Sequence, residues 1–376
     1  MEMSVPHTLS NNFIQHKMIL TFCQYHFLFW GEFMKRQTLC LIFGGKSSEY
    51  EVSLRSCACI LHNIRRDKYC IYKIGISRDG KWYFYLGDEN KIESGEWISE
   101  KELYPLQISL TDGSFICPRL NFSFRPDIIF PIMHGEGCED GALQGFFDIL
   151  DLYYVGCKRE ASVLGINKYL TKLLAKENGI PIAPYFIANS HTPTDILIEN
   201  SKNIGFPLYV KASSCGSSVG VYRALNEEEL LSSVKKALTF SKTALIEKEI
   251  RGIETEIAVL ETNGEIRLGK IGQIRHTGEF YDYEAKYRSC KTELIIPAEI
   301  TYEQKNIIRE YALRIFKAIG GRGLSRVDFF VYGDSVIFNE INTMPGFTSG
   351  SMYPLLVTGE NENISDLIDS ILMNEI

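Results

Sequence analysis

The chain has 376 residues, of which 45% are hydrophobic and 23% are charged, and its formal net charge is -7. This length accommodates two or three domains with a buried core, and the composition is that of a globular protein. The acidic balance argues against nucleic acid or an anionic membrane as the main partner and favours a small metabolite. The ten cysteines form no C-x-x-C pair and no zinc-spaced cluster, which predicts reduced thiols in the cytoplasm.

Residues 1–33 differ in character from the rest of the chain. The run 18–30 (MILTFCQYHFLFW) is apolar and aromatic, but it is too short to span a bilayer and is interrupted by Gln24 and His26. No small-residue cleavage site follows it, which argues against a signal peptide. We therefore expect residues 1–33 to be a peripheral extension of unknown role, with the folded protein beginning at Met34.

From Met34 onward, short apolar runs alternate with helical patterns. The segments TLCLIF (38–43) and DIIFPIM (127–133) predict buried strands, and a Gly-rich loop follows the second of them. We expect strands at 38–43, 69–76 and 127–133 and helices at 52–64 and 142–151. This alternation predicts a doubly wound α/β unit with ligand-binding loops at the strand ends.

A second unit is predicted after residue 180. Gly179 closes the helix expected at 167–178, and Pro181 and Pro184 mark the passage into new structure. Asn226 is the expected N-cap of the next long helix. We expect this helix at 226–237 and strands at 207–211, 219–224, 244–248 and 254–260, with more strands up to residue 338.

Three oxygen-bearing side chains near the end of the chain predict a metal site. Asp328, Glu340 and Asn342 lie on what we expect to be two neighbouring strands. Hard oxygen ligands of this kind suit Mg²⁺ held between a protein and the phosphates of a nucleotide. Arg326 lies two residues before Asp328, so on a strand both side chains point to one face. The pattern therefore predicts a site that handles phosphoryl groups.

Two short motifs resemble those of other enzyme classes, but their context in the sequence does not support either class. Residues 45–47 copy the tail of a P-loop, but the first glycine of that pattern would fall at Cys40, inside a strand. Residues 216–220 match the G-x-S-x-G of serine hydrolases, with Ser218 as the nucleophile. That motif requires a helix directly after the serine, whereas we expect a strand at 219–224. A phosphate-covering hairpin loop is the better interpretation, and the hydrolase is kept as an alternative.

The loop at 134–141 has its own chemistry. Its glycines are wrongly spaced for a dinucleotide fingerprint. A lone histidine is more often structural than functional. His134, however, ends a buried strand and opens a Gly-rich turn, which favours a place in the site.

Taken together, six ordered motifs resemble the D-alanine:D-alanine ligases, which are ATP-grasp enzymes of peptidoglycan precursor synthesis. The resemblance runs from about residue 35 to the C-terminus. The motifs are GGKSSEYEVSL (44–54), HGEGCEDGALQG (134–145), FPLYVKASSCGSSVG (206–220), EFYDYEAKY (279–287), SRVDFF (325–330) and NEINTMPGFTSGS (339–351). Three positions depart from the family pattern: Cys138 replaces a glycine, Cys215 a glutamate and Asn167 an aspartate. None removes a catalytic group, although Cys138 requires the turn to accept a Cβ.

The resemblance implies the fold and the reaction. We expect an N-terminal doubly wound α/β domain at 34–167 and a two-part ATP-grasp fold at 168–252 and 253–376, the last part carrying the metal site. The implied reaction is ATP-dependent ligation of two D-alanines through an acyl phosphate in a cytoplasmic homodimer, without nucleic acid or membrane. Alternatives are a D-alanine:D-lactate ligase or another ATP-grasp carboxylate–amine ligase, and a catalytically silent nucleotide-binding regulator. The intact EAKY motif with Tyr287 disfavours the lactate enzyme.

The resemblance also implies the cofactors and the residues that bind them. The cofactors are ATP and two Mg²⁺ ions, for which Mn²⁺ could substitute. Their implied ligands are Asp328, Glu340 and Asn342 for the metals; Lys168 and Lys211 for the α and β phosphates; Lys286 for the γ phosphate; Ser217 and Ser218 in the loop over the nucleotide; Glu247, Lys248 and Ile250 for adenine; and Glu254 for the ribose.

At the substrate end, the resemblance implies a second set of roles. Glu49 binds the ammonium group of the first D-alanine and His134 lies near its carboxylate. Arg326 and the backbone N–H of Gly346 stabilise the oxyanion, and Ser351 with Arg326 holds the second carboxylate. Glu49, Ser217 and Tyr287 form a hydrogen-bonded triad that closes a lid and excludes water, which would otherwise hydrolyse the acyl phosphate.

Overall fold

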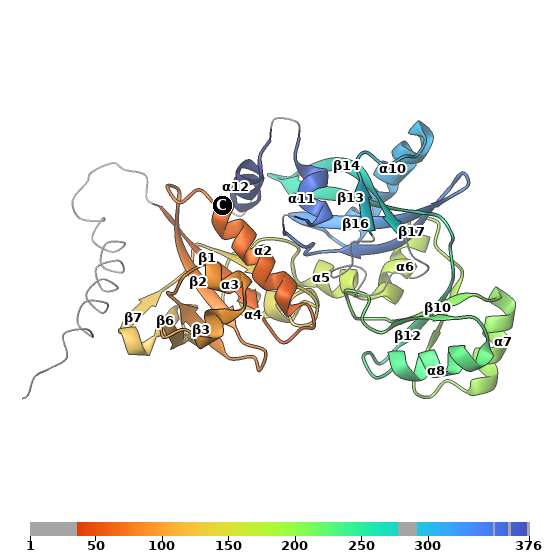
Figure 1. Cartoon of the computed structure of the whole chain (residues 1–376), viewed down its shortest axis with the longest axis horizontal. Helices are drawn as coiled ribbons and strands as arrows, with labels where there is room; N and C mark the ends of the chain where they lie inside the picture. Colours follow the sequence, from red (N-terminus) through yellow and green to blue (C-terminus); the bar gives the residue numbers. More distant parts are fainter. Residues whose placement is uncertain (1–35, 277–291, 349, 360–361, 374–376) are drawn as a thin grey trace, which may run out of the picture.

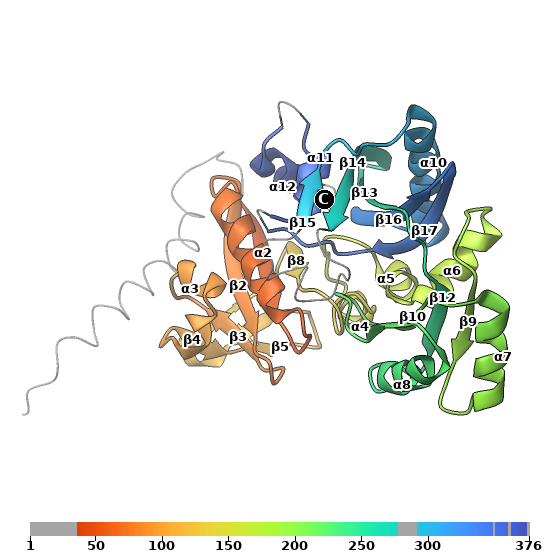
Figure 2. The ribbon, with the colours of Figure 1, turned by 45° about the vertical axis from the view of Figure 1, so that its right-hand side comes forward.

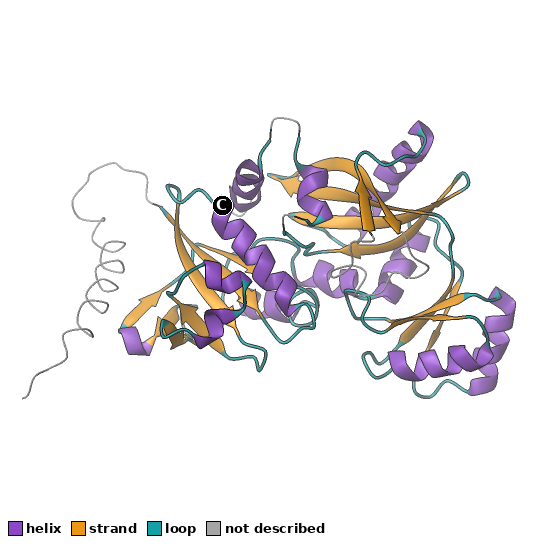
Figure 3. Ribbon diagram, in the orientation of Figure 1, coloured by secondary structure: helices purple, strands orange, loops and turns teal. Residues whose placement is uncertain are grey.

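The computed structural model describes residues 36–276, 292–348, 350–359 and 362–373 (Figure 1). The expected N-terminal extension, Lys286 and Tyr287 lie outside these described residues. Three main sheets follow one another along the chain, and each is accompanied by helices (Figure 3). Within the described residues, no helix is long and apolar enough to cross a membrane.

The first sheet has five strands in the order β4-β3-β2-β1-β8. Three adjacent strands, β1 (Gln37–Gly44), β2 (Tyr69–Ile76) and the edge strand β8 (Ile128–Ile132), are parallel, as the sequence predicts. β3 (Trp82–Tyr85) and β4 (Leu103–Pro105) extend it antiparallel. Helices α2 (Tyr50–Asn63) and α4 (Ala142–Ile149) follow β1 and β8, so the loops that precede both helices meet at the carboxyl edge of the sheet.

Shorter elements complete this part of the chain. A small antiparallel sheet and a few helical turns lie between β2 and β8. They are α3 (Asn90–Glu93), a 3-10 turn at Glu96–Ser99, β5 (Gln107–Ile108), β6 (Phe115–Cys117), a 3-10 turn at Pro118–Leu120 and β7 (Phe122–Phe124). None of these short elements was predicted from the sequence.

The second sheet is antiparallel, in the order β11-β10-β12-β9, with α7 and α8 on its outer side (Figure 1). Its elements are β9 (Tyr185–Ala188), α7 (Thr194–Ile204), β10 (Leu208–Ala212), β11 (Val221–Ala224), α8 (Glu227–Ala237) and β12 (Ala244–Lys248). Asn226 caps α8 by accepting a hydrogen bond from the N–H of Glu229 at 2.9 Å, as expected. Helices α5 (Arg159–Ile166) and α6 (Lys168–Glu177) precede this sheet.

The third sheet has the order β15-β14-β13-β16-β17 and is antiparallel. Its elements are β13 (Ile253–Thr262), β14 (Glu265–His276), β15 (Thr292–Ile295), α10 (Tyr302–Ala318), β16 (Leu324–Tyr332) and β17 (Ser335–Asn342). Along β13, Ile257 and Val259 pack in the core cluster of α10, whereas Ala258 and Leu260 pack with α11 (Met352–Val357). The sheet is therefore covered on both faces.

The end of the chain returns to the first sheet. Helix α12 (Ile364–Met373) lies beside α2 (Figure 2). The carboxylate of Asp369 lies 3.0 Å from Arg65 and 2.6 Å from Lys68. Apolar residues of β1, α2 and α12 share one core cluster with residues of β13 in the third sheet. This packing fixes the third sheet against the first, so loops from both can contribute to one site.

Candidate active site

The predicted metal ligands lie together on β16 and β17. Asp328 pairs with Glu340 in the register of the two strands, and Arg326 pairs with Asn342. The guanidinium of Arg326 donates to both carboxylate oxygens of Asp328, each at 2.8 Å. Asn342 Nδ2 donates to Asp328 at 3.1 Å. The structure thus places all four side chains on one face of the sheet, as their spacing indicates.

A third carboxylate, which the sequence analysis missed, extends this row. Glu256 on β13 pairs with Asp328, and its Oε2 lies 3.1 Å from Arg326 Nε. Although burial alone would lower the pKa of Arg326, the carboxylates of Asp328 and Glu256 raise it well above its usual value. The guanidinium is therefore permanently charged. The sequence contains one signal for Glu256. It lies two residues after Glu254, so the two side chains point to the same face of β13.

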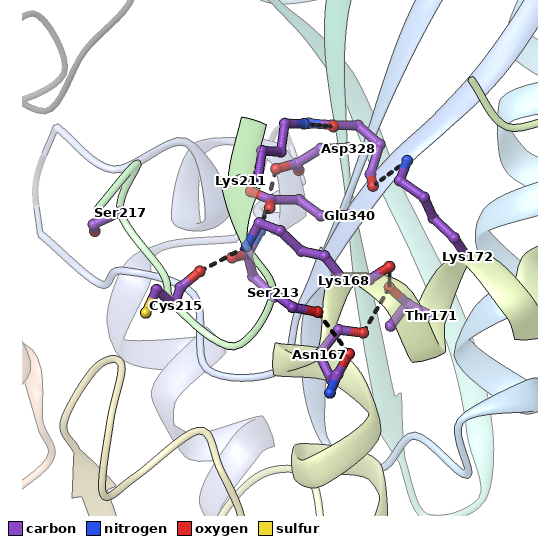
Figure 4. Close-up of polar contacts among 12 residues, drawn as sticks. Asn167, Lys168, Thr171, Lys172, Lys211, Ser213, Cys215, Ser217, Asp328 and Glu340 are labelled. Carbon is purple, nitrogen blue, oxygen red and sulfur yellow. Dashed lines mark hydrogen bonds and ion pairs between the residues drawn. The ribbon is translucent and has the colours of Figure 1, made fainter. Parts of the chain in front are cut away.

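Lys168, the first residue of α6, joins three segments of the site (Figure 4). Its Nζ lies 3.1 Å from Glu340 Oε2 and donates to the carbonyl oxygen of Cys215 at 2.7 Å. Lys168, Glu340, Asn342 and Cys215 line one small cavity. A lysine predicted to bind phosphate therefore lies beside two of the predicted metal ligands.

Asn167 fixes the start of α6, although it departs from the family's aspartate. Its Oδ1 accepts hydrogen bonds from the N–H groups of Tyr169 and Leu170, at 3.2 and 3.1 Å. It also accepts one from the hydroxyl of Ser213 at 3.0 Å. Asparagine is as good an N-cap as aspartate, so this departure leaves the cap intact.

Lys211 and Glu247 occupy one face of the second sheet. Lys211 on β10 pairs with Leu245 and Glu247 on β12 pairs with Tyr209, so the two side chains are diagonal neighbours that form an ion pair. Lys172 of α6, missed by the sequence analysis, lies 2.8 Å from the other oxygen of Glu247. Burial alone would raise the pKa of Glu247, but the two lysines lower it to about 2. The carboxylate is therefore ionised.

The remaining residues expected near the nucleotide flank this pair. Lys248 donates to the backbone carbonyls of Gly205 and Phe206, each at 2.9 Å. Ile250 follows β12 and is partly buried, and Glu254 lies near the start of β13. All three lie close in sequence to Glu247, at the crossing from the second sheet to the third.

The serine loop between β10 and β11 reaches the first sheet. Ser217 Oγ donates to the carboxylate of Glu49, which directly precedes α2. Gly216 has no Cβ, and one placed there would lie 2.8 Å from the other oxygen of Glu49. Ser217 and Ser218 have φ values of +48° and +59°, a strained backbone often found in functional loops. The third member of the expected triad, Tyr287, lies outside the described residues.

The hydrolase alternative is wrong. The chain that follows Ser218 forms β11, which pairs antiparallel with β10. A nucleophile elbow requires a helix at that point. The G-x-S-x-G segment is therefore a hairpin loop, as the sequence analysis favoured.

His134 is buried between the first sheet and the loop after β17. Its Nδ1 lies 3.0 Å from the carbonyl oxygen of Met344, and its Nε2 lies 3.2 Å from the hydroxyl of Ser56. The carbonyl requires a proton on Nδ1, so Nε2 accepts from Ser56. Burial lowers the pKa of His134, which favours this neutral ring.

The loop after β17 carries the expected oxyanion donor. Phe347 N–H donates to Ser56 Oγ at 3.1 Å, which fastens the loop to α2. Ser351 Oγ accepts from the N–H of Thr348 at 3.0 Å. A Cβ on Gly346 would lie 3.0 Å from Ser351 Oγ, so Gly346 and Ser351 are close neighbours.

The two cysteine departures are accommodated. Cys138 is fully buried, with its Sγ 3.7 Å from the carbonyl of Pro131, and it is not among the described residues with a positive φ. Its turn therefore accepts a Cβ without strain. Cys215 binds Lys168 through its backbone carbonyl, so the identity of its side chain does not affect that contact.

Fold and site together define an ATP-grasp carboxylate–amine ligase. An α/β unit is followed along the chain by two antiparallel sheets, and a cluster of lysines and carboxylates lies between these two sheets. Two family models match the chain: the D-ala D-ala ligase N-terminus over residues 38–157 and the D-ala D-ala ligase C-terminus over residues 174–373. The chain belongs to the D-alanine–D-alanine ligase family. The predictions of family, fold class and enzyme class are confirmed.

Individual relatives agree with this assignment. The chain is 38% identical to D-alanine–D-alanine ligases of Thermoanaerobacter sp. and Clostridium novyi, and in each case the match covers 90% of this chain and 96–97% of the relative. Among solved structures, it is similar to the VanG D-Ala:D-Ser ligase of Enterococcus faecalis, with a TM-score of 0.82, 32% identity and coverage of 91% and 100% of the two chains. The D-alanine–D-alanine ligase of Coxiella burnetii gives a TM-score of 0.80 at 29% identity, with coverage of 90% and 94%.

Proposed function

We propose that the protein joins two D-alanine molecules into D-alanyl-D-alanine for peptidoglycan precursors, using ATP. The observation that carries this proposal is the convergence of Lys168, Glu340 and Asn342 in one cavity, next to the serine loop that holds Glu49. The curated relatives are D-alanine–D-alanine ligases, and the match to this chain covers nearly their whole length. A carboxylate is a poor electrophile, so ATP first converts the carboxylate of one D-alanine into an acyl phosphate. The amine of the second D-alanine then attacks it.

The donor set fits Mg²⁺. Asp328, Glu340 and Asn342 offer hard oxygens from neighbouring positions of β16 and β17. We propose that these three residues hold two Mg²⁺ ions, which Mn²⁺ could replace. When bound, the ions neutralise the charge that accumulates on phosphate and carboxylate oxygens.

The nucleotide would lie between the second and third sheets. We propose that Lys168 and Lys211 bind its α and β phosphates and Lys286 its γ phosphate, with Ser217 and Ser218 in the loop above. Lysine ammonium groups are mobile point charges that suit phosphate oxygens. At the other end, we assign Glu247, Lys248 and Ile250 to the adenine and Glu254 to the ribose.

The amino acids would lie between the serine loop and the loop after β17. We propose that Glu49 binds the ammonium of the first D-alanine and that His134 lies near its carboxylate. Asp328 occupies Nε and Nη2 of Arg326, so the Nη1 end of the guanidinium is the part that can donate to the oxyanion, together with Gly346 N–H. Ser351 and Arg326 hold the second carboxylate, and Tyr287 completes the lid with Glu49 and Ser217.

The domain boundaries and the oligomeric state are also part of the proposal. We assign the N-terminal domain to 34–167 and the two parts of the ATP-grasp fold to 168–252 and 253–376. We also propose that the protein is a homodimer in the cytoplasm. Analytical ultracentrifugation of the purified chain tests the dimer.

Product analysis tests the proposed function. We expect mass spectrometry to detect D-alanyl-D-alanine after incubation with ATP, Mg²⁺ and D-alanine. D-Serine or D-lactate, supplied with D-alanine as a competing second substrate, should yield little mixed product. A dominant D-alanyl-D-serine or D-alanyl-D-lactate product would transfer the assignment to another member of the fold.

A further inference from the structure

Lys172 is a buried lysine to which none of the roles above has been assigned. It lies one turn after Lys168 on α6, and its side chain is 1% exposed. Its ammonium group lies 2.8 Å from Glu247 and 3.5 Å from the backbone carbonyl of Asn339. A buried ammonium is costly unless its charge is compensated, so these contacts need a reason.

The two lysines that contact Glu247 come from different elements (Figure 4). Lys211 extends from β10, is 12% exposed and also donates to the side chain of Asn339 at 3.1 Å. Lys172 approaches from α6, and its contacts are a carboxylate and a backbone carbonyl of the protein interior. The Lys172 ammonium is thus enclosed by protein groups, whereas the Lys211 side chain is the more exposed of the two.

We infer that Lys172 is a positioning residue for nucleotide binding: it is the permanent counter-ion of Glu247, and it frees Lys211 to donate to a phosphate oxygen. The inference rests on the proposed function in one respect, namely that ATP is the ligand. Without Lys172, Lys211 would be the main cation that compensates a buried carboxylate. If Lys211 then moved to a phosphate, the Glu247 carboxylate would be left buried without a counter-ion, which is strongly unfavourable.

The electrostatics of the cluster agree with this division of roles. Burial lowers the pKa of Lys172 below its ordinary value, and the nearby Glu247 opposes this shift. The Glu247 carboxylate therefore benefits from a cation that remains in place whether or not a nucleotide is bound. Asn339, on β17, contacts both lysines and holds them in a fixed relation to the strand that carries Glu340.

The test compares Lys172→Met with Lys176→Met, a matched control on the exposed side of the same helix. ATP affinity is measured by calorimetry without D-alanine, so the readout does not depend on ligase activity. We expect Lys172→Met to weaken ATP binding by about tenfold or more. Lys176→Met should bind ATP like the wild type. Equal affinity in the two variants would overturn the inference.

A double variant tests whether Lys172 acts through Glu247, and it also serves if Lys172→Met fails to fold. In the Glu247→Gln background there is no carboxylate to compensate, so adding Lys172→Met should change ATP affinity less than threefold. A tenfold loss in that background would show that Lys172 acts directly, and would refute the inference. If the wild type itself binds no ATP, both the inference and the proposed function fail. If it binds ATP and Lys172→Met binds equally well, the inference alone fails.

Discussion

The carboxylate of Glu139 accepts a hydrogen bond from the N–H of Met344 at 3.1 Å, although 205 residues separate them in the chain. It also accepts one from the N–H of Gly135 at 2.8 Å. Because His134 binds the carbonyl of Met344, the turn after β8 holds both sides of this residue's backbone. The Gly-rich turn after β8 of the first sheet thus fixes the loop after β17 of the third sheet, which carries Gly346.

Replacing Glu139 should disturb this loop. Glu139→Gln retains the shape of the side chain but replaces one acceptor oxygen with an NH2 group, which cannot accept a hydrogen bond. Burial and the nearby Glu49 raise the pKa of Glu139 to about 8, so near pH 7 the side chain is largely protonated. A hydrogen bond to an uncharged group contributes about 0.5–1.5 kcal/mol, so we expect kcat to fall by up to roughly tenfold. Glu139 also lines the cavity that contains Lys168 and Glu340, so the KM for ATP is measured together with kcat.

Steady-state kinetics and melting temperature measure this effect. Glu136→Gln, an exposed carboxyl in the same turn, is the matched control. An unchanged kcat in folded Glu139→Gln would contradict a role for this contact in placing Gly346.

The stability of the protein should depend on the protonation of His134. Burial lowers its folded pKa below the unfolded value of about 6.5. The folded state therefore favours the neutral ring, and the contribution is fully present above about pH 6.5. It is lost as the pH falls through the folded pKa. We expect the contribution of His134 to the free energy of unfolding to decrease between pH 7.5 and 5.5.

Denaturant unfolding of wild type and His134→Gln at both pH values checks the assignment. The variant cannot titrate at this position, so the free energy of unfolding of the wild type should fall relative to that of the variant as the pH is lowered. The same pH dependence in the two proteins would contradict a contribution from His134.

Replacing a proposed metal ligand should lower turnover far more than replacing an exposed carboxylate nearby in the chain. Asp328→Ala or Glu340→Ala should lower turnover by about 10³-fold in a folded protein, because each removes a proposed ligand of Mg²⁺. Mn²⁺ binding measured by calorimetry in the presence of ATP should weaken in parallel. Asp334→Ala, in the exposed turn between β16 and β17, should behave like the wild type. Near-normal turnover in either ligand variant would refute the metal assignment.

The N-terminal extension should be dispensable. The apolar run at 18–30 is too short to span a membrane, and β1 begins only at Gln37. We expect a chain that starts at Met34 to have the melting temperature and kcat of the full-length protein. Failure of the shorter chain to fold would show that the extension packs on the core.

Local sequence patterns predicted much of the fold. β2 and β12 begin and end at the expected residues, and Asn226 caps α8, because alternation and capping depend on neighbours in the chain. The pairing of Asp328 with Glu340 could be predicted for the same reason, since one tight turn joins their strands. The small sheet of β5, β6 and β7 was missed because its strands have only two or three residues each.

The residues that the sequence analysis missed all depend on distant partners. Glu256 meets Arg326 across a sheet, Lys172 meets Glu247 between a helix and a strand, and Glu139 meets Met344 between the first and third sheets. Each looks like an ordinary surface charge when only its neighbours in the chain are considered. Only the tertiary fold shows that each is buried and paired.

The most direct test of the account is phosphate release from ATP by the purified protein. Attack on the γ phosphate requires a carboxylate held in line with it, so release should be slow without amino acid. We predict a strong rise with D-alanine and Mg²⁺ and a weak response to L-alanine. Phosphate release that does not depend on D-alanine, or hydrolysis of a model ester without ATP, would contradict the account.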